Sequence, residues 1–457
     1  MPHVFSGMVT TLSPYRMLPF LLATALFIPA LLHAQQSVLQ AGPMLGHLDM
    51  QEARIWIQTK SEADVYVTYR DSSQPSEAFR TRTIRTSEAT ACTATLVADR
   101  VRPGRTYLYD VHINGKACRF DYPTRFRTQP VWKWRPDPPP TYTIALGSCF
   151  YVNEEGFERS TGNYGSDYEI MTAIHAARPD FMLWLGDNTY LREPDWNSRT
   201  GILHRYTHTR SLPELQPLLA STAHYAIWDD HDYGPNDADR SWWGKYNALE
   251  AFRLFWPNPS YGVMDRPGIA TSFEAGDVQF FLLDDRYYRA ANNRKDGERT
   301  ILGNEQIEWL IDALSSSTAT FKIIAIGSQF LTDNVRKECF ARMPEERRKI
   351  IDMITRNGIK GVLFVSGDIH AAELSRLDRP DTYPLYEFTC SSLTAGANTG
   401  INDQSNTFRV PGTAVGQHNF GTITVGGPSK KRVLTLRVFD KSGRELWNRV
   451  ITEGELQ

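Results

Sequence analysis

The feature of this sequence that most constrains its fold is a short apolar run that ends in polar residues able to bind a ligand. Residues 181–185 are apolar throughout, which is typical of a parallel strand buried on both faces. Gly186, Asp187 and Tyr190 follow this run. In α/β folds, sites are built at strand ends, so this exit is a candidate site. Taken alone, the segment also fits a simple turn, because Gly, Asp and Asn are common turn residues.

Three further apolar strands end in the same kind of residue. Their exits are residues 147–149 (Gly-Ser-Cys), 229–232 (Asp-Asp-His-Asp) and 367–370 (Gly-Asp-Ile-His). Because the exits of parallel strands lie on one edge of a sheet, we expect the four clusters to converge. The alternative is a salt-linked sheet edge in which His231 and His370 are structural hydrogen-bond partners.

The chemistry of these side chains fits two metal ions. A thiolate from Cys149 and a phenolate from Tyr190, together with hard oxygen ligands, favour a ferric ion at one position. Carboxylate and amide oxygens suit calcium, manganese or magnesium at the other position. The sequence therefore predicts a centre with two metals at the strand exits.

The order of the predicted elements indicates two structural parts. In residues 35–130, short alternating strands separated by turn residues predict an antiparallel β-sandwich. Consecutive prolines in residues 131–140 predict a semi-rigid linker. In residues 141–457, strands alternate with helices, which indicates an α/β domain with a strand-rich tail. A length of 457 residues suits more than one domain.

The individual elements follow from hydrophobic periodicity and turn residues. The strands predicted in the first part are residues 53–59, 63–70, 89–97, 106–113 and 118–127. The helices predicted in the second part are residues 167–177, 212–222, 242–255, 305–314 and 345–356. Its predicted strands are residues 143–149, 181–186, 225–228, 271–275, 278–283, 322–327, 362–366, 386–390, 420–425, 433–439 and 445–451, and residues 396–415 are expected to be a polar loop.

The first 34 residues have the pattern of a Sec-type export signal. Arg16 supplies the positive charge, residues 17–32 are apolar, and cleavage is expected near Ala34. The apolar run is short for a membrane-spanning helix, although an uncleaved anchor is the alternative. We expect a secreted or periplasmic chain with no integral membrane span after cleavage. A formal net charge of −2 gives no basic field for a specific nucleic-acid partner.

Five cysteines raise the question of disulfides, because an oxidising compartment favours pairing. Cys92 can pair with Cys118, and Cys339 with Cys390, which would leave Cys149 as the free thiol. Connectivity does not follow from sequence alone, so these pairs are hypotheses.

The motifs at the strand exits resemble those of a known family. The segments that carry the resemblance are residues 42–47 (Gly-Pro-Met-Leu-Gly-His), 147–149 (Gly-Ser-Cys), 186–190 (Gly-Asp-Asn-Thr-Tyr), 228–232 (Trp-Asp-Asp-His-Asp), 302–310 (Leu-Gly-x-x-Gln-x-x-Trp-Leu) and 366–370 (Ser-Gly-Asp-Ile-His). Together they resemble the alkaline phosphatase D (PhoD-like) metallophosphoesterases, relatives of the purple acid phosphatases. The resemblance covers residues 42 to about 451.

The resemblance implies both a fold and a reaction. The implied fold is a fibronectin-like β-sandwich followed by an αββα metallophosphoesterase core. The implied activity is hydrolysis of phosphate mono- or diesters at a ferric ion paired with a divalent metal. Calcium is the first expectation for the divalent metal, and manganese, magnesium and zinc are alternatives.

The resemblance also implies a set of metal ligands. Cys149 and Tyr190 would bind the ferric ion, Asp187 would bridge the two metals, and Asp368 would be a further ligand near both. Where the wider superfamily has a metal-binding Asn, this chain has Asp230, and Asn236 lies just downstream as an alternative amide ligand. The sequence does not decide between Asp230 and Asn236.

Further residues are implied in catalysis or substrate binding. His231 would protonate the leaving group or hold the phosphate, and His370 would bind either the second metal or the phosphate. Arg286 is a candidate substrate contact, with a surface ion pair as its alternative role. Two weaker candidates are Asn153 and Gln329.

The expected mechanism is attack on phosphorus by a metal-bound hydroxide, with His231 or water protonating the leaving group. We expect a monomer acting on a small-molecule phosphate ester. A phosphodiesterase or phospholipase D-type hydrolase shares the same ligand set, so sequence does not separate it from a monoesterase. The remote alternative is a non-catalytic secreted binding protein, whose ligand motifs would be broken; here they are intact.

Overall fold

The computed structural model describes residues 38–135, 138–158, 162, 164–335 and 338–457 of the chain. The export signal predicted for residues 1–34 lies outside these described residues. Within them, no helix has both the length and the apolar character needed to cross a membrane.

The largest element of the fold is a nine-stranded mixed sheet. From one edge to the other it contains β21 (Glu445–Thr452), β20 (Val433–Asp440), β19 (Asn419–Gly426), β10 (Tyr142–Gly147), β11 (Phe181–Leu185), β12 (Ala223–Ile227), β1 (Leu39–Leu48), β2 (Ala53–Thr59) and β6 (Thr93–Ala98). The strands β10, β11 and β12 are parallel, so their carboxyl ends lie on the same edge of the sheet.

A second, six-stranded sheet packs against the first. It contains, in order, β13 (Thr271–Ala275), β14 (Val278–Leu282), β15 (Phe321–Ala325), β16 (Val362–Ser366), β18 (Leu385–Thr389) and β17 (Glu373–Leu377). Its strands β14, β15, β16 and β18 are parallel, and β13 and β14 form the predicted hairpin around Gly276.

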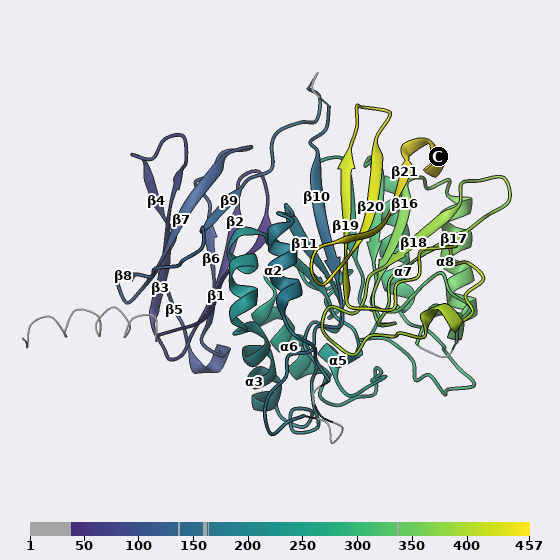
Figure 1. Cartoon of the computed structure of the whole chain (residues 1–457), viewed down its shortest axis with the longest axis horizontal. Coiled ribbons are helices and arrows are strands. Elements are labelled where there is room, and N and C mark those ends of the chain that lie inside the picture. The colour runs from purple at the N-terminus through teal and green to yellow at the C-terminus, as the bar shows by residue number, and fades with distance from the viewer. Residues whose placement is uncertain (1–37, 136–137, 159–161, 163, 336–337) are drawn as a thin grey trace, which may run out of the picture.

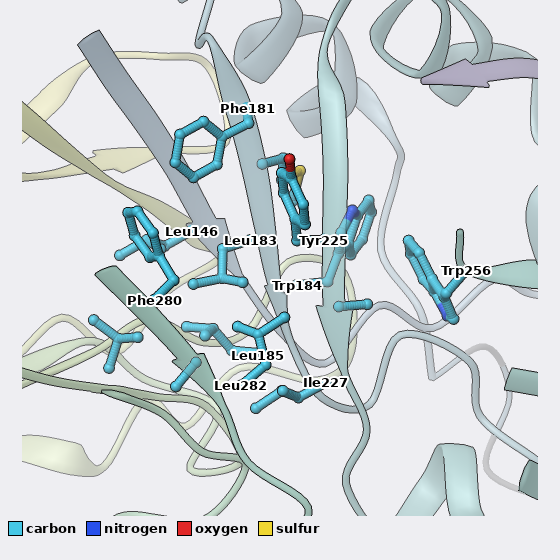
Figure 2. Packing of buried hydrophobic residues seen from close by; sticks show 14 of the residues in the cluster. Leu146, Phe181, Leu183, Trp184, Leu185, Tyr225, Ile227, Trp256, Phe280 and Leu282 are labelled. Carbon is cyan, nitrogen blue, oxygen red and sulfur yellow. The ribbon is translucent and has the colours of Figure 1, made fainter. Parts of the chain in front are cut away.

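The two sheets meet through the inner faces of their central strands. All residues of β11 are buried, which confirms the strand buried on both faces. Phe181 packs edge-on against Phe280 of β14, with ring centroids 5.3 Å apart. Figure 2 shows Leu183 on this side, whereas Trp184 points to the other face and lies 5.6 Å from the ring of Trp256.

Helices lie outside the two sheets. They are α2 (Glu169–Ala176), α3 (Arg199–Arg210), α4 (Gln216–Ser221), α5 (Asp230–Tyr233), α6 (Lys245–Phe255), α7 (Asn304–Ser316) and α8 (Pro344–Arg356). Figure 1 shows α2, α3 and α6 on the side of β10 and β11, and α8 beside β17 and β18. Trp309 of α7 packs on Phe281 of β14, at a centroid distance of 6.3 Å. The short 3₁₀ helices are η1 (Glu88–Thr90), η2 (Pro213–Leu215), η3 (Phe340–Arg342), η4 (Ile401–Asp403) and η5 (Glu453–Leu456).

The N-terminal strands divide between two sheets. A separate sheet has the order β4 (Ala78–Arg80), β3 (Asp64–Asp71), β7 (Thr106–Ile113) and β8 (Lys116–Ala117), with β5 (Ile84–Arg85) on β3 and β9 (Arg125–Arg127) on β7. The strands β1, β2 and β6 instead continue the nine-stranded sheet, because β1 pairs in parallel with β12 at Leu45 and Ala223. Hydrogen bonding therefore crosses the predicted boundary at residues 131–140.

Most predicted elements are present, and the larger differences are the following. The strand predicted for residues 89–97 begins later, as β6, because η1 precedes it. The strand predicted for residues 118–127 is only the short β9. Helix α3 and strand β17 were not predicted from the sequence.

The disulfide hypotheses are wrong for this structure, in which all five cysteines are free thiols. Cys92 precedes β6 in the nine-stranded sheet, whereas Cys118 follows β8 in the separate N-terminal sheet. Cys339 instead directs its sulfur to the carbonyl of Asn334, at 3.5 Å, and Cys390 is buried at the end of β18. These thiols lie on different elements.

Candidate metal centre

The four strand exits come together, as the sequence predicts, but they come from two sheets. Cys149 follows β10, Asp187 follows β11, and Asp230 opens α5 directly after β12. Asp368 follows β16, a strand of the second sheet. The site therefore lies where the carboxyl ends of both sets of parallel strands meet.

Ligand atoms gather here in overlapping groups. In each group the atoms lie within 4.8 Å of one another. The groups are Cys149 with Asp187 and His370, Asp187 with Asp230 and His231, Asp229 with Asp230 and Asp368, and Asp230 with Asp237 and Glu338. Asp187 belongs to the first two groups and Asp230 to the last three. The groups are therefore continuous, and Asp187 lies between two candidate metal positions.

The two oxygens of Asp187 face different partners. Its Oδ2 accepts a hydrogen bond from the Tyr190 hydroxyl at 3.1 Å and lies 3.6 Å from Cys149 Sγ. Its Oδ1 accepts from the backbone N–H of His231 at 3.2 Å. A carboxylate placed in this way can give one oxygen to each of two cations.

On one side of Asp187 lie a buried thiol, a buried phenol and a partly buried imidazole. The Tyr190 hydroxyl lies 3.3 Å from His370 Nε2, and Ser391 donates a hydrogen bond to Cys149 Sγ at 3.0 Å. Burial and the nearby Asp368 carboxylate raise the pKa of the Cys149 thiol. Burial likewise raises the pKa of Tyr190, so both groups need a cation to ionise near neutral pH.

The other side is built by the first turn of α5. Asp230 accepts a hydrogen bond from the backbone N–H of Asp237 at 2.8 Å and is buried among the acidic groups. Asn236 is exposed and donates its side-chain amide to Asp237 at 2.9 Å. Of the two alternatives from the sequence, the structure brings Asp230 into the cluster. The ring of His231 stacks on Tyr190 with centroids 4.2 Å apart.

The backbone at this site adopts conformations that are rare for residues with a side chain. The φ angles are +57° at Cys149, +53° at Asp187, +67° at Asp368 and +57° at His370. Such left-handed conformations cost about 1–3 kcal/mol each and are concentrated at functional sites. Four of them at the strand exits support a functional role for this edge.

Glycines precede these residues because the strands approach one another closely. A Cβ on Gly186, whose φ is +91°, would lie 2.6 Å from the Cβ of Asp229. A Cβ on Gly367 would lie 2.3 Å from Ser148 Oγ. Any larger residue would push the exits apart, so both glycines allow the ligand groups to converge.

The donor set fits a pair of cations. Burial and the negative groups of Asp230, Cys149 and Asp232 raise the pKa of Asp187 well above its usual value. A buried cluster of carboxylates, thiol and phenol is unfavourable without compensating positive charge. Thiolate, phenolate, imidazole and carboxylate are also ligands that proteins offer to iron and to divalent metals.

Arg286 is placed differently from its predicted role. Its side chain is fully buried and forms ion pairs with Asp229 and, at 2.5 Å, with Glu338. Glu338 also pairs with Arg289 at 3.1 Å. This burial argues against direct substrate contact, and it replaces the suggested surface ion pair with a buried one.

Sequence reasoning included Asp229 among the exit residues without assigning its role, and it missed Tyr164. Asp229 caps α5 in a reciprocal arrangement with Asp232, and an acidic residue repeated after three positions is a capping signature that could have shown this role. Tyr164 places its hydroxyl 3.4 Å from Nδ1 of His370, the face opposite Tyr190. No local sequence pattern indicates that contact.

The two weaker candidates have structural partners. Asn153 exchanges hydrogen bonds with the backbone of Gly165, at 2.8 and 3.0 Å, and so holds the segment that carries Tyr164. Gln329 is buried and donates to Glu373 at 2.9 Å and to Thr389 at 3.1 Å. These contacts explain both residues without a substrate.

Comparisons with known proteins found two matching family models and a curated relative. Residues 157–421 match the family model described as PhoD-like phosphatase, and residues 36–131 match a domain of unknown function. Alkaline phosphatase D of Bacillus subtilis (strain 168) is 24% identical over 370 residues, which cover 68% of this chain. The match covers 62% of that protein, so this chain spans less than two thirds of its length.

Two solved structures share the fold. A structure described as PhoD superposes with a TM-score of 0.71 at 19% identity and covers 90% of this chain and 88% of that one. A purple acid phosphatase from yellow lupin (Lupinus luteus) seeds superposes with a TM-score of 0.62 at 13% identity. That match covers 90% of this chain and 74% of the lupin chain.

Proposed function

This chain belongs to the PhoD-like phosphatase family, and from that premise we propose that it hydrolyses phosphate esters at the centre around Asp187. The observation that carries the proposal is the position of Asp187, which is shared by two groups of ligand atoms. Its two oxygens face opposite groups, as a bridge between two metal ions requires. Substrates are phosphate mono- or diesters of small molecules.

We propose specific ligands for the two metals. Cys149, Tyr190 and one oxygen of Asp187 would hold a ferric ion. The other oxygen of Asp187, with Asp230 and Asp368, would hold a divalent ion, calcium first and manganese, magnesium or zinc as alternatives. When bound, such a pair supplies positive charge to the phosphoryl oxygens and makes a water molecule a nucleophile near neutral pH, the basis of the proposed metal-bound hydroxide.

The tautomer of His370 supports its role as a ligand. Its Nδ1 lies at hydrogen-bond distance from the carbonyl oxygen of Gly396, which can only accept, so Nδ1 carries the proton. In the neutral ring, Nε2 then presents a lone pair toward Tyr190 and the ligand group of Cys149. The Nε2 atom thus serves either as a metal ligand or as a contact for the phosphate.

The remaining step belongs to His231. Its backbone is held by Asp187 and its ring by stacking on Tyr190, and the side chain is only partly buried. An imidazole in this position can hold a proton and pass it to the leaving oxygen of a bound ester. We propose this proton transfer, or a hydrogen bond to the phosphate, as its role. The buried Arg286 then acts indirectly, through Asp229.

The setting of the enzyme is proposed from the sequence. Residues 35–130 would form a fibronectin-like sandwich whose strands β1, β2 and β6 also extend the nine-stranded sheet. Residues 131–140 would be a linker, and residues 141–457 the αββα catalytic domain. The pattern of residues 1–34 supports export by a Sec-type signal, giving a secreted or periplasmic monomer.

A phosphodiesterase or phospholipase D-type hydrolase is the second candidate, because it would use the same ligands. Side-by-side turnover of 4-nitrophenyl phosphate and bis(4-nitrophenyl) phosphate, by protein supplied with iron and calcium, separates the two. A strong monoester preference supports a phosphatase, and a diester preference supports the second candidate. Turnover of neither substrate by metal-loaded protein would favour the remote alternative, a non-catalytic binding protein.

A further inference from the structure

A large cavity lies away from the candidate metal centre. Its volume is about 1000 Å³, at the upper end of the range for small-molecule sites. It is bordered by β9, by the end of α2 and by the first residues of β10, β11 and β12, including Tyr142, Phe181 and Ala223. Segments from the N-terminal sheet and from the catalytic part of the chain therefore both line it.

The cavity opens at the opposite end of the strands from the metal centre. Phe181 begins β11 and lines the cavity, whereas Asp187 follows the last residue of the same strand. At about 3.3 Å per residue, the two sites are roughly 15–20 Å apart. A ligand bound in the cavity would therefore not touch the catalytic groups.

Three arginines give the cavity a positive rim. Arg125 and Arg127 flank the buried Phe126 on β9, so both extend from the same face of that strand. Arg178 lines the cavity from the turn after α2. All three are exposed, and among the described residues none of them forms a close ion pair. Asp180, the acidic residue of the lining, accepts the backbone N–H of Thr143 at 2.8 Å. Burial raises the pKa of Asp180, and the charge of Arg127 partly opposes that effect.

Two of the arginines also act on a histidine of the lining. His175 lines the cavity, and its pKa is lowered first by burial and then by the charges of Arg125 and Arg178. This effect is consistent with both arginines lining the same cavity. Arg178 holds a left-handed φ of +51°, a conformation that Arg adopts only at a cost.

The inner wall of the cavity consists of aromatic residues that pack against one another. The rings of Tyr225 and Phe273 stack with centroids 3.9 Å apart, and Phe181 packs edge-on to Tyr225 at 5.6 Å. Figure 2 shows Phe181 and Tyr225 side by side on neighbouring strands. The Tyr225 hydroxyl accepts from the backbone N–H of Leu48. Phe181, Tyr225 and Phe273 are nearly fully buried, so they form a firm floor and offer little surface to a ligand.

We propose that this cavity is a second, non-catalytic site that binds a dianionic phosphate or phosphonate. Arg125, Arg127 and Arg178 would hold the dianion by charge-assisted hydrogen bonds. Three arginines against one aspartate leave the lining with an excess of positive charge, which favours such an anion. This site does not depend on the activity proposed for the metal centre.

The test is calorimetric titration of the metal-loaded full chain with phenylphosphonate, a dianion that cannot be hydrolysed as an ester. The catalytic centre can also bind it, so the titration is repeated with Asp187→Asn, Arg125→Gln and Arg178→Gln. The proposal predicts a binding event for phenylphosphonate that persists in Asp187→Asn. Its affinity should fall at least about tenfold in each arginine variant. Arg82→Gln, the removal of an exposed arginine outside the cavity, is the matched control and should bind unchanged.

Other outcomes would overturn the proposal. If the arginine variants bind phenylphosphonate as tightly as the unaltered chain does, the observed binding belongs to the metal centre. Absence of binding at ligand concentrations up to about 10 mM would also reject the proposal. Should Asp187→Asn not fold, the arginine variants alone decide, because a catalytic event would survive in them.

Discussion

Single residues at the metal centre are fixed by an inner set of contacts and by a layer behind it. Asp187 touches Tyr190, Cys149 and the backbone of His231, so its position depends on three separate strand exits. Behind this set, Arg286 holds Asp229, and Asp229 caps the short helix that carries Asp230. The outer layer determines where the ligands point, as is usual around metal sites.

Replacing Arg286 tests that outer layer. Arg286→Met leaves the buried carboxylate of Asp229 without its cation and leaves Glu338 with Arg289 alone, which should lower the free energy of unfolding by about 3–5 kcal/mol. Arg286→Lys should recover part of this loss. Urea unfolding of metal-free protein measures the change, and the metal content and the split between kcat and KM report on the ligands.

The matched control for Arg286 is a surface pair. Arg266 and Glu305 are both about half exposed, so Arg266→Met should change stability by less than about 1 kcal/mol. Equal stability of Arg286→Met and Arg266→Met would show that the buried ion pair does not support the site.

Among the elements, strand exits were predictable and polar elements were not. Apolar runs such as β11 and β16 predict buried strands. The ligand-type residues after them indicate the edge of the sheet at which the site lies. Strand β17 is not recognisable from its sequence, because it buries a charged residue, Glu373. The charge of Glu373 is balanced by Arg409, which lies far along the chain. A local pattern cannot show that partner.

Helix α3 was missed for the same physical reason. It buries Arg205, which pairs with Asp195 and Glu154, and Arg210, whose guanidinium lies 3.9 Å from the ring centre of Trp256. These arginines interrupt the apolar stripe by which a helix is recognised. The burial of Arg286 was equally hidden, since its partners Asp229 and Glu338 come from other loops.

Strand β18 carries a buried acid that should make stability depend on pH. Glu387 accepts the backbone N–H groups of Phe330 and Leu331, and burial raises its pKa to about 7. The folded state therefore binds this proton more tightly than the unfolded state. The resulting stability is complete below about pH 4.5 and is lost as pH rises through about 7, a change of about 3 kcal/mol.

Glu387→Gln isolates this effect, because glutamine stays neutral at every pH. It keeps one oxygen for the two N–H groups, so we expect it to be less stable than the unaltered chain at pH 5. Between pH 5 and 8 this deficit should shrink or reverse. Urea midpoints of the metal-free proteins measure it, and parallel pH profiles for the two proteins would contradict the shifted pKa.

At the scale of the whole molecule, the N-terminal strands and the catalytic part are joined by more than a linker. Strand β1 pairs with β12, and the indole N–H of Trp56 donates to the carbonyl of Leu254 in α6 at 2.7 Å. The Tyr109 hydroxyl donates to the carbonyl of Ala220 in α4, also at 2.7 Å. The prolines of residues 131–140 indicated a boundary in the sequence, but a sheet shared across it depends on pairing between distant strands.

Removal of residues 1–140 tests this integration. It would expose the edge of β12 and the apolar surface under Trp56, so we expect aggregation or a Tm lower by at least about 10 °C. Size-exclusion chromatography and a thermal melt measure the outcome. Removal of residues 1–34 alone is the control and should leave Tm unchanged. A chain from residue 141 that stays monomeric at the Tm of the longer protein would establish two independent domains.

The central claim is that Asp187 bridges two metal ions on which turnover depends. The most direct test measures iron and calcium per chain, and turnover of 4-nitrophenyl phosphate, for the unaltered protein and for Asp187→Asn. Asp312→Asn, on the exposed face of α7, is the matched control. We expect two metals per chain in the unaltered and control proteins. In Asp187→Asn we expect loss of both metals and a fall in turnover of at least about a thousandfold. Asp187→Asn protein with full metal content and full activity would contradict the account.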